Sequence, residues 1–234
     1  MANPRPQPTN KPLSDNQSIL VKRIIKAHPL QFVSAVVIGP RGAGKSMYCY
    51  KVMARVYQIL FDLDEAESYK MALDHMMFSM PELGRLIAKN VRTRYSTPVI
   101  CLDDASVHYF SQLYFTKQEQ VTAIHGVFDT IRVACSGMLL NCPNEEALLS
   151  FIRNYNHYKI MIHKSDGHWG RYARAYKFNR LPDGKKKNIT IPFQDNFSCH
   201  VPDEYFQWYM DKRYKILEES NKRMMKALAR FEEE

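Results

Sequence analysis

An eight-residue run, Gly39-Pro-Arg-Gly-Ala-Gly-Lys-Ser46, has the residue types and the spacing of a phosphate-binding loop. It matches G-x-x-x-x-G-K-[ST] in full, a pattern in which backbone N–H groups converge on a phosphate and glycines allow close approach. A β-branched run precedes it and a helical pattern follows, so a helix N-terminus adds its positive dipole end. We therefore expect a nucleotide to be bound through its phosphates by Gly39, Pro40, Arg41, Gly42, Ala43, Gly44, Lys45, Ser46 and Met47.

The chemistry of such a loop also requires a cation and an acidic partner. Lys45 is expected to reach the β- and γ-phosphates, and the Ser46 hydroxyl to ligate Mg²⁺. A second apolar run, 98–103, ends in Asp103 and is followed by Asp104. Adjacent carboxylates after a buried strand are costly without a nearby cation. We predict that Asp103 completes the metal shell and Asp104 polarises the attacking water, the alternative being that either carboxylate only caps the following loop.

The elements that must position these residues alternate between short apolar strands and helices. This pattern predicts an α/β fold, a mainly parallel sheet flanked by helices, with the phosphate loop of a P-loop NTPase after its first strand. Strands are expected at 32–38, 98–103 and 137–142, and helices at 15–26, 46–60, 65–78, 81–92, 117–133 and 144–154.

The C-terminal part has a different texture, which predicts β-hairpins and a terminal helix. Strands at 158–163 and 171–178 are expected to be joined through 165–167, and a turn at 181–184 leads to a strand at 188–193. A final helix opens at Pro202 and carries seven basic against eight acidic residues from Asp203 onward, which is typical of a surface or interaction helix. The predicted organisation is a disordered Pro-rich arm at 1–14, a domain at 15–200 with basic β-hairpins at 153–193, and a C-terminal helix at 201–234.

Most of the net charge of +9 lies in one stretch. Between Arg153 and Lys187, ten Lys or Arg residues stand against two Asp residues. Such a stretch is typical of a polyanion partner, because each cation that meets a phosphate releases condensed counterions. We expect segment 153–187 to bind DNA, the alternative being a solvated hairpin surface. For Trp169, Tyr172 and Tyr176 we favour strand packing over base stacking.

Composition excludes several other classes of protein. Hydrophobic residues make up 45% and charged residues 24% of the 234, as in an ordinary globular domain. No apolar run approaches the roughly 20 residues of a membrane-spanning helix, so we expect no membrane association. The five cysteines form no C-x-x-C pair, and the histidines show no metal-ligand spacing. We therefore expect buried free thiols and a cytoplasmic protein, in the host cytoplasm if the chain is viral.

The motifs together resemble a known class. The phosphate loop at 39–46, the strand end at Asp103-Asp104 and the strand end at Asn141 come in the order of the additional-strand P-loop ATPases, which include RecA-like motors, AAA+ proteins and HerA/FtsK pumps. The resemblance covers about Val33 to His163. ATP is favoured over GTP because the chain has no N-K-x-D motif. With hairpins where AAA+ proteins have a helical lid, the chain is similar to ATPases of archaeal viruses and plasmids and to viral DNA-packaging motors.

This resemblance implies further roles at single positions. Asn141 corresponds to a polar residue that senses the γ-phosphate, with a turn-forming role as the alternative. Arg153 is a candidate arginine finger toward a neighbouring subunit, with Arg132 as a competitor and an ordinary surface role open for both. Arg41 faces either the nucleotide or a neighbour. The class usually carries Glu where this chain has Asp104, so the shorter side chain implies slow hydrolysis.

Three functions remain compatible with the sequence. We favour an ATP-driven motor that moves or packages DNA as a homo-oligomeric ring. In the alternative, ATP is a switch ligand, and a loader with slow turnover binds DNA or a replication partner. A small-molecule kinase, with a lid hidden in 61–95, would leave the basic hairpins without a role.

Overall fold

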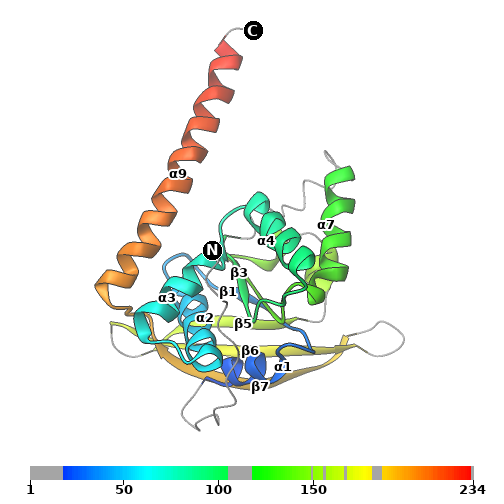
Figure 1. Cartoon of the computed structure of the whole chain (residues 1–234), viewed down its shortest axis with the longest axis vertical. Coiled ribbons are helices and arrows are strands. Elements are labelled where there is room, and N and C mark those ends of the chain that lie inside the picture. Colours follow the sequence, from blue (N-terminus) through cyan, green and yellow to red (C-terminus); the bar gives the residue numbers. More distant parts are fainter. Residues whose placement is uncertain are drawn as a thin grey trace. The chain divides into compact units, whose positions relative to one another are not determined.

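The core of the molecule is a seven-stranded sheet with the order β2-β3-β4-β1-β5-β6-β7 (Figure 1). It is seen in a computed structural model that describes residues 18–104, 118–148, 150–154, 157–165, 168–180 and 186–232. The first five strands in this order are parallel, and β6 and β7 continue the sheet as antiparallel strands. The fold is therefore α/β with a mainly parallel sheet, as predicted. The strands are β1 Val33–Ile38, β2 Met76–Met77, β3 Ile100–Leu102, β4 Gly137–Cys142, β5 Tyr158–Lys164, β6 Gly170–Arg180 and β7 Lys186–Ser198.

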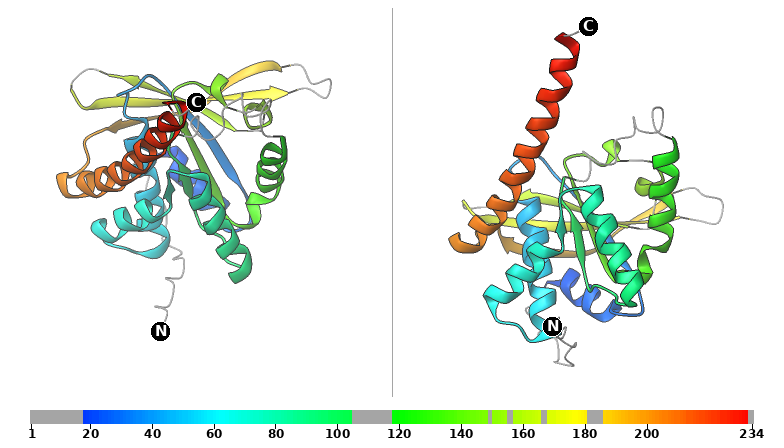
Figure 2. Two further views of the ribbon diagram at one scale, coloured as in Figure 1. Left: turned by 90° about the horizontal axis from the view of Figure 1, so that it is seen from above. Right: turned by 45° about the horizontal axis from the view of Figure 1, so that its top comes forward.

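Helices cover both faces of the parallel part of the sheet (Figure 2). On one face, residues of α4 and α7 pack in one apolar cluster with strand residues such as Val36, Ile100 and Met138. On the other face α2 contacts β1, β3 and β4, and α1 and α3 contact α2. The helices of this body are α1 Ile19–Ala27, α2 Lys45–Phe61, α3 Glu65–Asp74, α4 Met80–Thr93, α7 Gln118–Thr130 and α8 Ser150–Asn154, with 3₁₀ turns η1 Ile131–Val133 and η2 Glu145–Ala147.

Helix α2 is buried along nearly its whole length because both sheet and neighbouring helices enclose it. Tyr48, Tyr50 and Tyr57 are each at most 2% exposed. The Tyr57 hydroxyl donates a hydrogen bond to the Val99 carbonyl, and the Tyr48 hydroxyl donates to Asp195 at 2.9 Å. Buried hydroxyls that find partners in this way fix the helix against the sheet, and with it the loop that precedes the helix.

One predicted helix, 65–78, is wrong at its C-terminal end. Helix α3 stops at Asp74, and Met76–Met77 form the short edge strand β2. The reason is tertiary pairing: Cys101 N–H donates to the His75 carbonyl at 3.1 Å, and Asp103 N–H donates to the Met77 carbonyl at 2.9 Å. Sheet hydrogen bonds that sequence periodicity does not reveal have overridden the helical pattern.

The predicted helix 144–154 is divided in the structure. Asn144 accepts a hydrogen bond from the backbone of Glu146 and so begins η2, a single turn, while α8 starts only at Ser150. Between them Leu148 is extended (φ −79°, ψ 150°) and fully buried in the apolar cluster under α4 and α7. Burying this side chain requires a break that a continuous helix would not allow.

The predicted hairpin strands belong to the central sheet. β5 pairs in parallel with β1, so the first hairpin extends the sheet that carries the phosphate loop. β7 runs from Lys186 to Ser198, well beyond the predicted 188–193, because Phe193 and Asp195 face the helices and are buried. Asp195 accepts hydrogen bonds from Ser18 Oγ and Ile19 N–H at the start of α1, which ties β7 to that helix.

The chain divides into two compact units, residues 1–200 and 201–234. The second unit consists of helix α9, Asp203–Glu232, close to the predicted 202–231. Predictions for the arm at 1–14, for the turn at 181–184 and for Asp166-Gly167 lie outside the described residues.

Candidate phosphate-binding site

The loop between β1 and α2 has the backbone conformation that its glycines predict. Gly42 has φ 74° and Gly44 has φ 96°, both in the left-handed region where residues with a Cβ are strained. A Cβ on Gly44 would also lie 3.1 Å from the Cβ of Cys199. Because Gly44 precedes α2 and has no side chain, no capping side chain covers the first N–H groups of that helix. The helix N-terminus is therefore open to an anion.

The Lys45 side chain folds back against the loop that precedes it. Its side chain is only 8% exposed, and Nζ donates hydrogen bonds to the carbonyls of Gly39 at 2.9 Å and Pro40 at 3.0 Å. Burial lowers the pKa of the Lys45 ammonium below its usual value, and the carboxylates of Asp104 and Asp103 oppose that shift. An anion that enters the loop would meet a cation that is already desolvated and held in place.

Ser46, Asp103 and Asn141 meet beside the loop, although they come from α2, the end of β3 and β4. Ser46 Oγ donates to Asp103 Oδ1 at 3.0 Å, and Asn141 Nδ2 donates to Ser46 Oγ at 2.9 Å and also to Asp103 Oδ1. Asp103 is 0% exposed and Asn141 is 1% exposed. The predicted sensor residue and the two predicted metal ligands therefore form one hydrogen-bonded cluster, in which Asp103 and Asn141 are buried and Ser46 is half-buried.

This cluster fits a hydrated divalent cation. Hydroxyl and carboxylate oxygens are the ligands that Mg²⁺ prefers in proteins. Within the described part of the chain, the buried Asn141 Oδ1 has no hydrogen-bond partner. A buried oxygen without a donor is rare and calls for an explanation, and a metal-bound water that donates to it would supply one.

Asp104 follows the cluster at the first turn after β3. It is half-buried and has φ 50°, a left-handed conformation that Asp tolerates better than most residues. Its carboxylate favours the charged form of Lys45 and so opposes the fall in the pKa of that ammonium. The predicted role as a water-polarising base stays a prediction.

The predicted arginines are less closely associated with the loop. Arg41 lies in the loop with its side chain exposed, and Arg132 is exposed on η1. Arg153 lies on α8, half-buried, and its buried Nε has no hydrogen-bond partner among the described residues. No hydrogen bond of the described part of the chain joins Arg153 to the Ser46–Asp103–Asn141 cluster. Met47 is 9% exposed and packs in the core, so only its backbone is available to a ligand.

Sequence reasoning missed a residue that supports the loop, Arg171 at the start of β6. It is 9% exposed, and its Nε donates to the Ala43 carbonyl inside the loop at 3.2 Å. Its Nη1 donates to the carbonyls of His168 at 3.1 Å and Gly170 at 2.7 Å. From the sequence alone, Arg171 was one of ten basic residues predicted to bind DNA. Its contact with the phosphate loop becomes visible only once the strands are placed in register.

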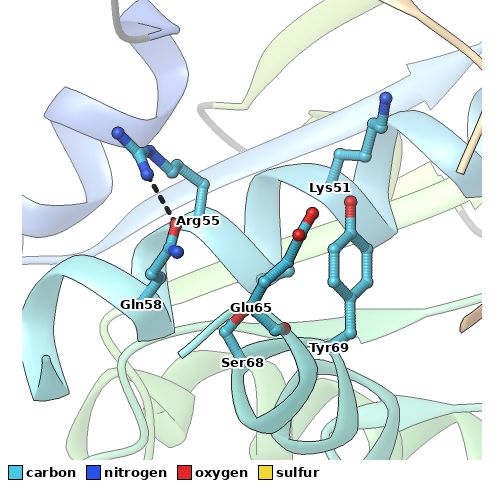
Figure 3. A pocket seen from close by; sticks show the side chains of 7 residues that line it. Lys51, Arg55, Gln58, Glu65, Ser68 and Tyr69 are labelled. Atoms are coloured by element: carbon cyan, nitrogen blue, oxygen red, sulfur yellow. Dashed lines mark hydrogen bonds between the residues drawn. The ribbon is translucent and has the colours of Figure 1, made fainter. Parts of the chain in front are cut away.

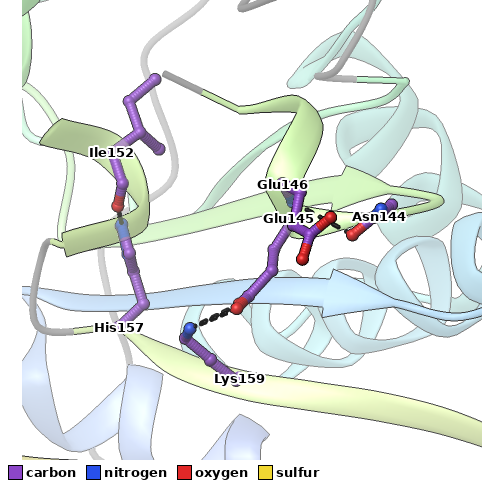
Figure 4. A network of polar contacts seen from close by, with 6 residues as sticks. All are labelled: Asn144, Glu145, Glu146, Ile152, His157 and Lys159. Carbon is purple, nitrogen blue, oxygen red and sulfur yellow. Dashed lines mark hydrogen bonds and ion pairs between the residues drawn. The ribbon is translucent and has the colours of Figure 1, made fainter. Parts of the chain in front are cut away.

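Two more basic residues of that stretch have internal roles. Lys159 is 9% exposed and forms an ion pair with Glu145, with Nζ–Oε distances of 2.5 and 2.7 Å (Figure 4). Lys177 lies over the ring of Tyr158, 5.2 Å from its centroid. Charge counting therefore overstated how much of segment 153–187 is available to a polyanion.

A polar aromatic surface remains on the face of β5–β7 opposite α1 and α2. Tyr172 stacks on His163 with centroids 4.8 Å apart, and the Arg174 guanidinium lies 5.3 Å from the centre of the Tyr172 ring. Arg174 also donates to Gln194 Oε1 from Nε at 3.1 Å and from Nη2 at 3.0 Å. We call this the β5–β7 surface, formed by His163, Tyr172, Arg174, Tyr176, Gln194 and Asn196, which are all half-buried or exposed.

A separate hollow of about 370 Å³ lies between α2 and α3 (Figure 3). It is lined mainly by polar side chains, including Lys51, Arg55 and Glu65. Lys51 Nζ donates to the Ser198 carbonyl at 2.8 Å, and Arg55 donates to Gln58. None of the predicted phosphate-site residues lines this hollow.

The other expectations of the sequence concern thiols, metals and membranes. Cys49, Cys101, Cys135 and Cys142 are buried free thiols, and Cys199 is half-buried. Among the described residues, no group of three or more His, Cys, Asp or Glu side chains could hold a metal ion. No described helix has the length and apolar character needed to span a bilayer.

Two viral proteins are similar to this chain, whereas no protein-family model matches it. "Uncharacterized protein B-251" of Sulfolobus spindle-shape virus 1 is 27% identical over 206 residues, which cover 84% of this chain and 80% of the relative. "Uncharacterized protein ORF286" of Acidianus two-tailed virus is 27% identical over 207 residues, covering 78% and 69%. Among solved structures, a KaiC-like protein of Pyrococcus horikoshii OT3 is similar over 68% of this chain and 88% of its own, with 13% identity and a TM-score of 0.30.

Proposed function

We propose that this chain is a viral Mg²⁺-dependent ATPase that binds ATP at the loop 39–47. The observation that carries the proposal is the hydrogen-bonded cluster of Ser46, Asp103 and Asn141 beside a left-handed glycine loop. Helix α2, the end of β3 and strand β4, far apart in sequence, contribute a hydroxyl, a carboxylate and an amide to one position. Such a group of oxygen ligands next to a phosphate loop serves metal-assisted phosphate chemistry.

The order of the strands supports the additional-strand class. β4 lies between β1, which leads into the phosphate loop, and β3, which ends at Asp103. The two viral relatives support a viral origin. The absence of an N-K-x-D motif supports ATP over GTP.

In the proposed reaction, water attacks the γ-phosphorus of bound ATP, the bond from that phosphorus to the β–γ bridging oxygen breaks, and ADP and inorganic phosphate leave. Bound Mg²⁺ supplies positive charge beside the phosphates. Lys45 neutralises charge that develops on the transferred group, and backbone N–H groups of the loop hold the phosphates in place. Asp104 accepts a hydrogen bond from the attacking water, and Asn141 orients the γ-phosphate. Arg153 acts from a neighbouring subunit of a homo-oligomer.

We propose further that hydrolysis drives the movement or packaging of DNA in the host cytoplasm. The β5–β7 surface and the exposed Lys164 supply aromatic rings and positive charge for a backbone-directed contact. β6 offers a mechanical connection, because Arg171 on this strand donates to Ala43 in the phosphate loop. In the proposed motor, this hydrogen bond would link a change in the phosphate loop to a change in β6.

A second candidate, an ATP-dependent switch with slow turnover, is favoured by one residue. Asp104 is one methylene shorter than the Glu that related ATPases carry, so a water between its carboxylate and a γ-phosphate is less well held. Such a protein would bind DNA or a replication partner in its ATP state and release it slowly.

Steady-state ATP hydrolysis with and without double-stranded DNA separates these functions. For a motor we expect stimulation of several-fold by DNA, lost in both Lys45→Ala and Asp104→Asn. Turnover near zero in every condition, with ATP still bound by the unaltered chain, would contradict the motor and leave the switch. Absence of ATP binding would contradict both.

A further inference from the structure

Helix α9 carries an apolar stripe along one side. The helix spans 30 residues and belongs to a compact unit of its own. Tyr214, Leu217, Met225 and Leu228 are 59%, 54%, 61% and 49% exposed. At 3.6 residues per turn these four side chains fall within a sector of about 80° on one side of the helix. We call this set the α9 stripe.

Three of the four stripe residues have the spacing of a coiled coil, and Met225 lies beside that seam. Tyr214, Asn221 and Leu228 follow one another at intervals of seven residues, and Leu217 stands three residues after Tyr214. Leu217, Met224 and Phe231 form a second series in the sequence, again at intervals of seven residues. A strict seven-residue repeat stays on one face only if two helices supercoil around each other, because a straight helix drifts by about 20° per heptad.

Asn221 lies between the residues of the α9 stripe on the same side of the helix, and its side chain indicates that the partner is a second copy of this chain. A carboxamide has both donors and an acceptor, so it is left unsatisfied against an apolar surface. Opposite the same residue of a second copy, the two amides satisfy each other, and such a pair fixes register and two-stranded association. The stripe is therefore complementary to itself.

The charges beside the stripe agree with a parallel arrangement. Arg213 and Glu218 flank the stripe on opposite sides and are five residues apart. In a parallel pair, Arg213 of one copy lies beside Glu218 of the other, whereas an antiparallel pair does not bring these positions together. Glu218 already forms an ion pair with Lys222 on its own helix at 2.9 Å, so the contribution of the intermolecular pair is small.

We propose that two copies of this chain associate through their α9 stripes as a parallel, two-stranded coiled coil. The inference does not depend on the proposed ATPase function, because no stripe residue belongs to the phosphate loop. It assigns α9 as the element through which subunits recognise one another.

Disulfide trapping in the full-length chain tests the register directly. Asn221→Cys places two thiols at facing positions of a parallel pair, where Cα atoms lie within reach of a disulfide. Glu219→Cys is the matched control, because residue 219 lies on the opposite side of the helix. The unaltered chain gives the background from its five native cysteines. After mild oxidation we expect most Asn221→Cys chains, and fewer than a tenth of Glu219→Cys chains, to run as dimers on a non-reducing gel. Equal yields in the two variants would overturn the proposal.

Sedimentation under reducing conditions provides the second measurement. We expect the unaltered chain to dimerise reversibly, and the double variant Leu217→Asp/Leu228→Asp to be at least tenfold weaker in self-association while it binds Mg·ATP unchanged. Unaltered self-association in the double variant, or a strictly monomeric unaltered chain, would overturn the coiled coil. Loss of ATP binding in the unaltered chain would instead count against the proposed function alone.

Discussion

The phosphate-loop end of the sheet and the outer strands β6 and β7 are both rich in polar residues, but packing uses these residues in different ways. At the loop, Ser46, Asp103 and Asn141 converge on one another and form a hydrogen-bonded cluster. On the outer strands, Arg171 and Arg174 belong to the same strand and differ by three positions, yet one is buried under the loop and the other is half-exposed on the β5–β7 surface.

The difference shows that a motif specifies where its residues lie, whereas a count of charges does not. A fixed spacing such as 39–46 specifies a backbone conformation, so the positions of its members follow together. A count of Lys and Arg specifies only a sum, and the alternation of a β-strand sends successive residues to opposite faces. Lys159 and Arg171 contribute to the sum but are engaged inside the protein.

The largest expected effect tests the phosphate-loop side of this comparison. Asp103→Asn keeps the size of the side chain but removes the charge that a metal requires. We expect ATP turnover to fall by about 10³-fold while the melting temperature changes little. The matched control is Asp129→Asn, an exposed residue of α7 whose carboxylate pairs with His125 at 3.2 Å. If both variants lost activity equally, Asp103 would have no special place in the site.

A smaller effect tests whether a basic residue of segment 153–187 stabilises the fold rather than binding a polyanion. Lys159→Met leaves the Glu145 carboxylate without its partner, and we expect the free energy of unfolding to fall by about 3 kcal/mol in chemical denaturation. Exposed Lys164 is the control, and Lys164→Met should lower DNA affinity without changing stability. The reverse pattern would contradict the division between internal and surface cations.

Arg171 and Arg174 sharpen the comparison within one strand. Arg171→Ala removes hydrogen bonds to three carbonyls, one of them in the loop, so we expect about 2 kcal/mol of destabilisation and weaker ATP binding. Arg174→Ala should leave ATP binding unchanged and weaken DNA binding by about threefold, with a smaller dependence on salt. Titrations of ATP and of DNA into both variants measure the contrast. Equal ATP affinities and equal DNA affinities in the two variants would contradict the expected contrast.

The phosphate-loop end of the sheet was more predictable from the sequence than the outer strands β6 and β7. The strand–loop–helix motif and the polar residues at the ends of two further strands could be located from spacing and composition alone, because each is a local pattern. The edge strand at Met76–Met77, the extended Leu148 and the contact between Arg171 and Ala43 could not, because each depends on a partner distant in sequence. The sequence favoured packing for Trp169, Tyr172 and Tyr176. Trp169 is 51% exposed but its ring lies against those of His168 and His200, and Tyr172 stacks on His163.

The last prediction concerns pH and His157, which immediately precedes β5 and links β1 to α8. Its ring forms hydrogen bonds with the Ile152 carbonyl at 2.8 Å (Figure 4) and with Ser34 Oγ at 2.7 Å. Burial lowers the pKa of His157 to about 4. Because the unfolded state binds the proton more readily, stability is full above about pH 6.5 and is lost as the pH falls from there toward 4. We expect the free energy of unfolding to drop by about 2 kcal/mol from pH 7 to pH 5. His157→Gln should remove that part of the pH dependence, and an unchanged slope would assign it to other groups.

Equilibrium binding of Mg·ATP tests whether the loop 39–47 holds the phosphates of a nucleotide. Calorimetric titration of the unaltered chain, of Lys45→Ala and of Arg174→Ala compares a loop cation with a cation of the β5–β7 surface. We predict one saturable site per chain, weakened by about 100-fold in Lys45→Ala and unchanged in Arg174→Ala. Equal affinity in the unaltered chain and in Lys45→Ala would contradict the account, because the desolvated ammonium inside the loop would then have no phosphate to bind.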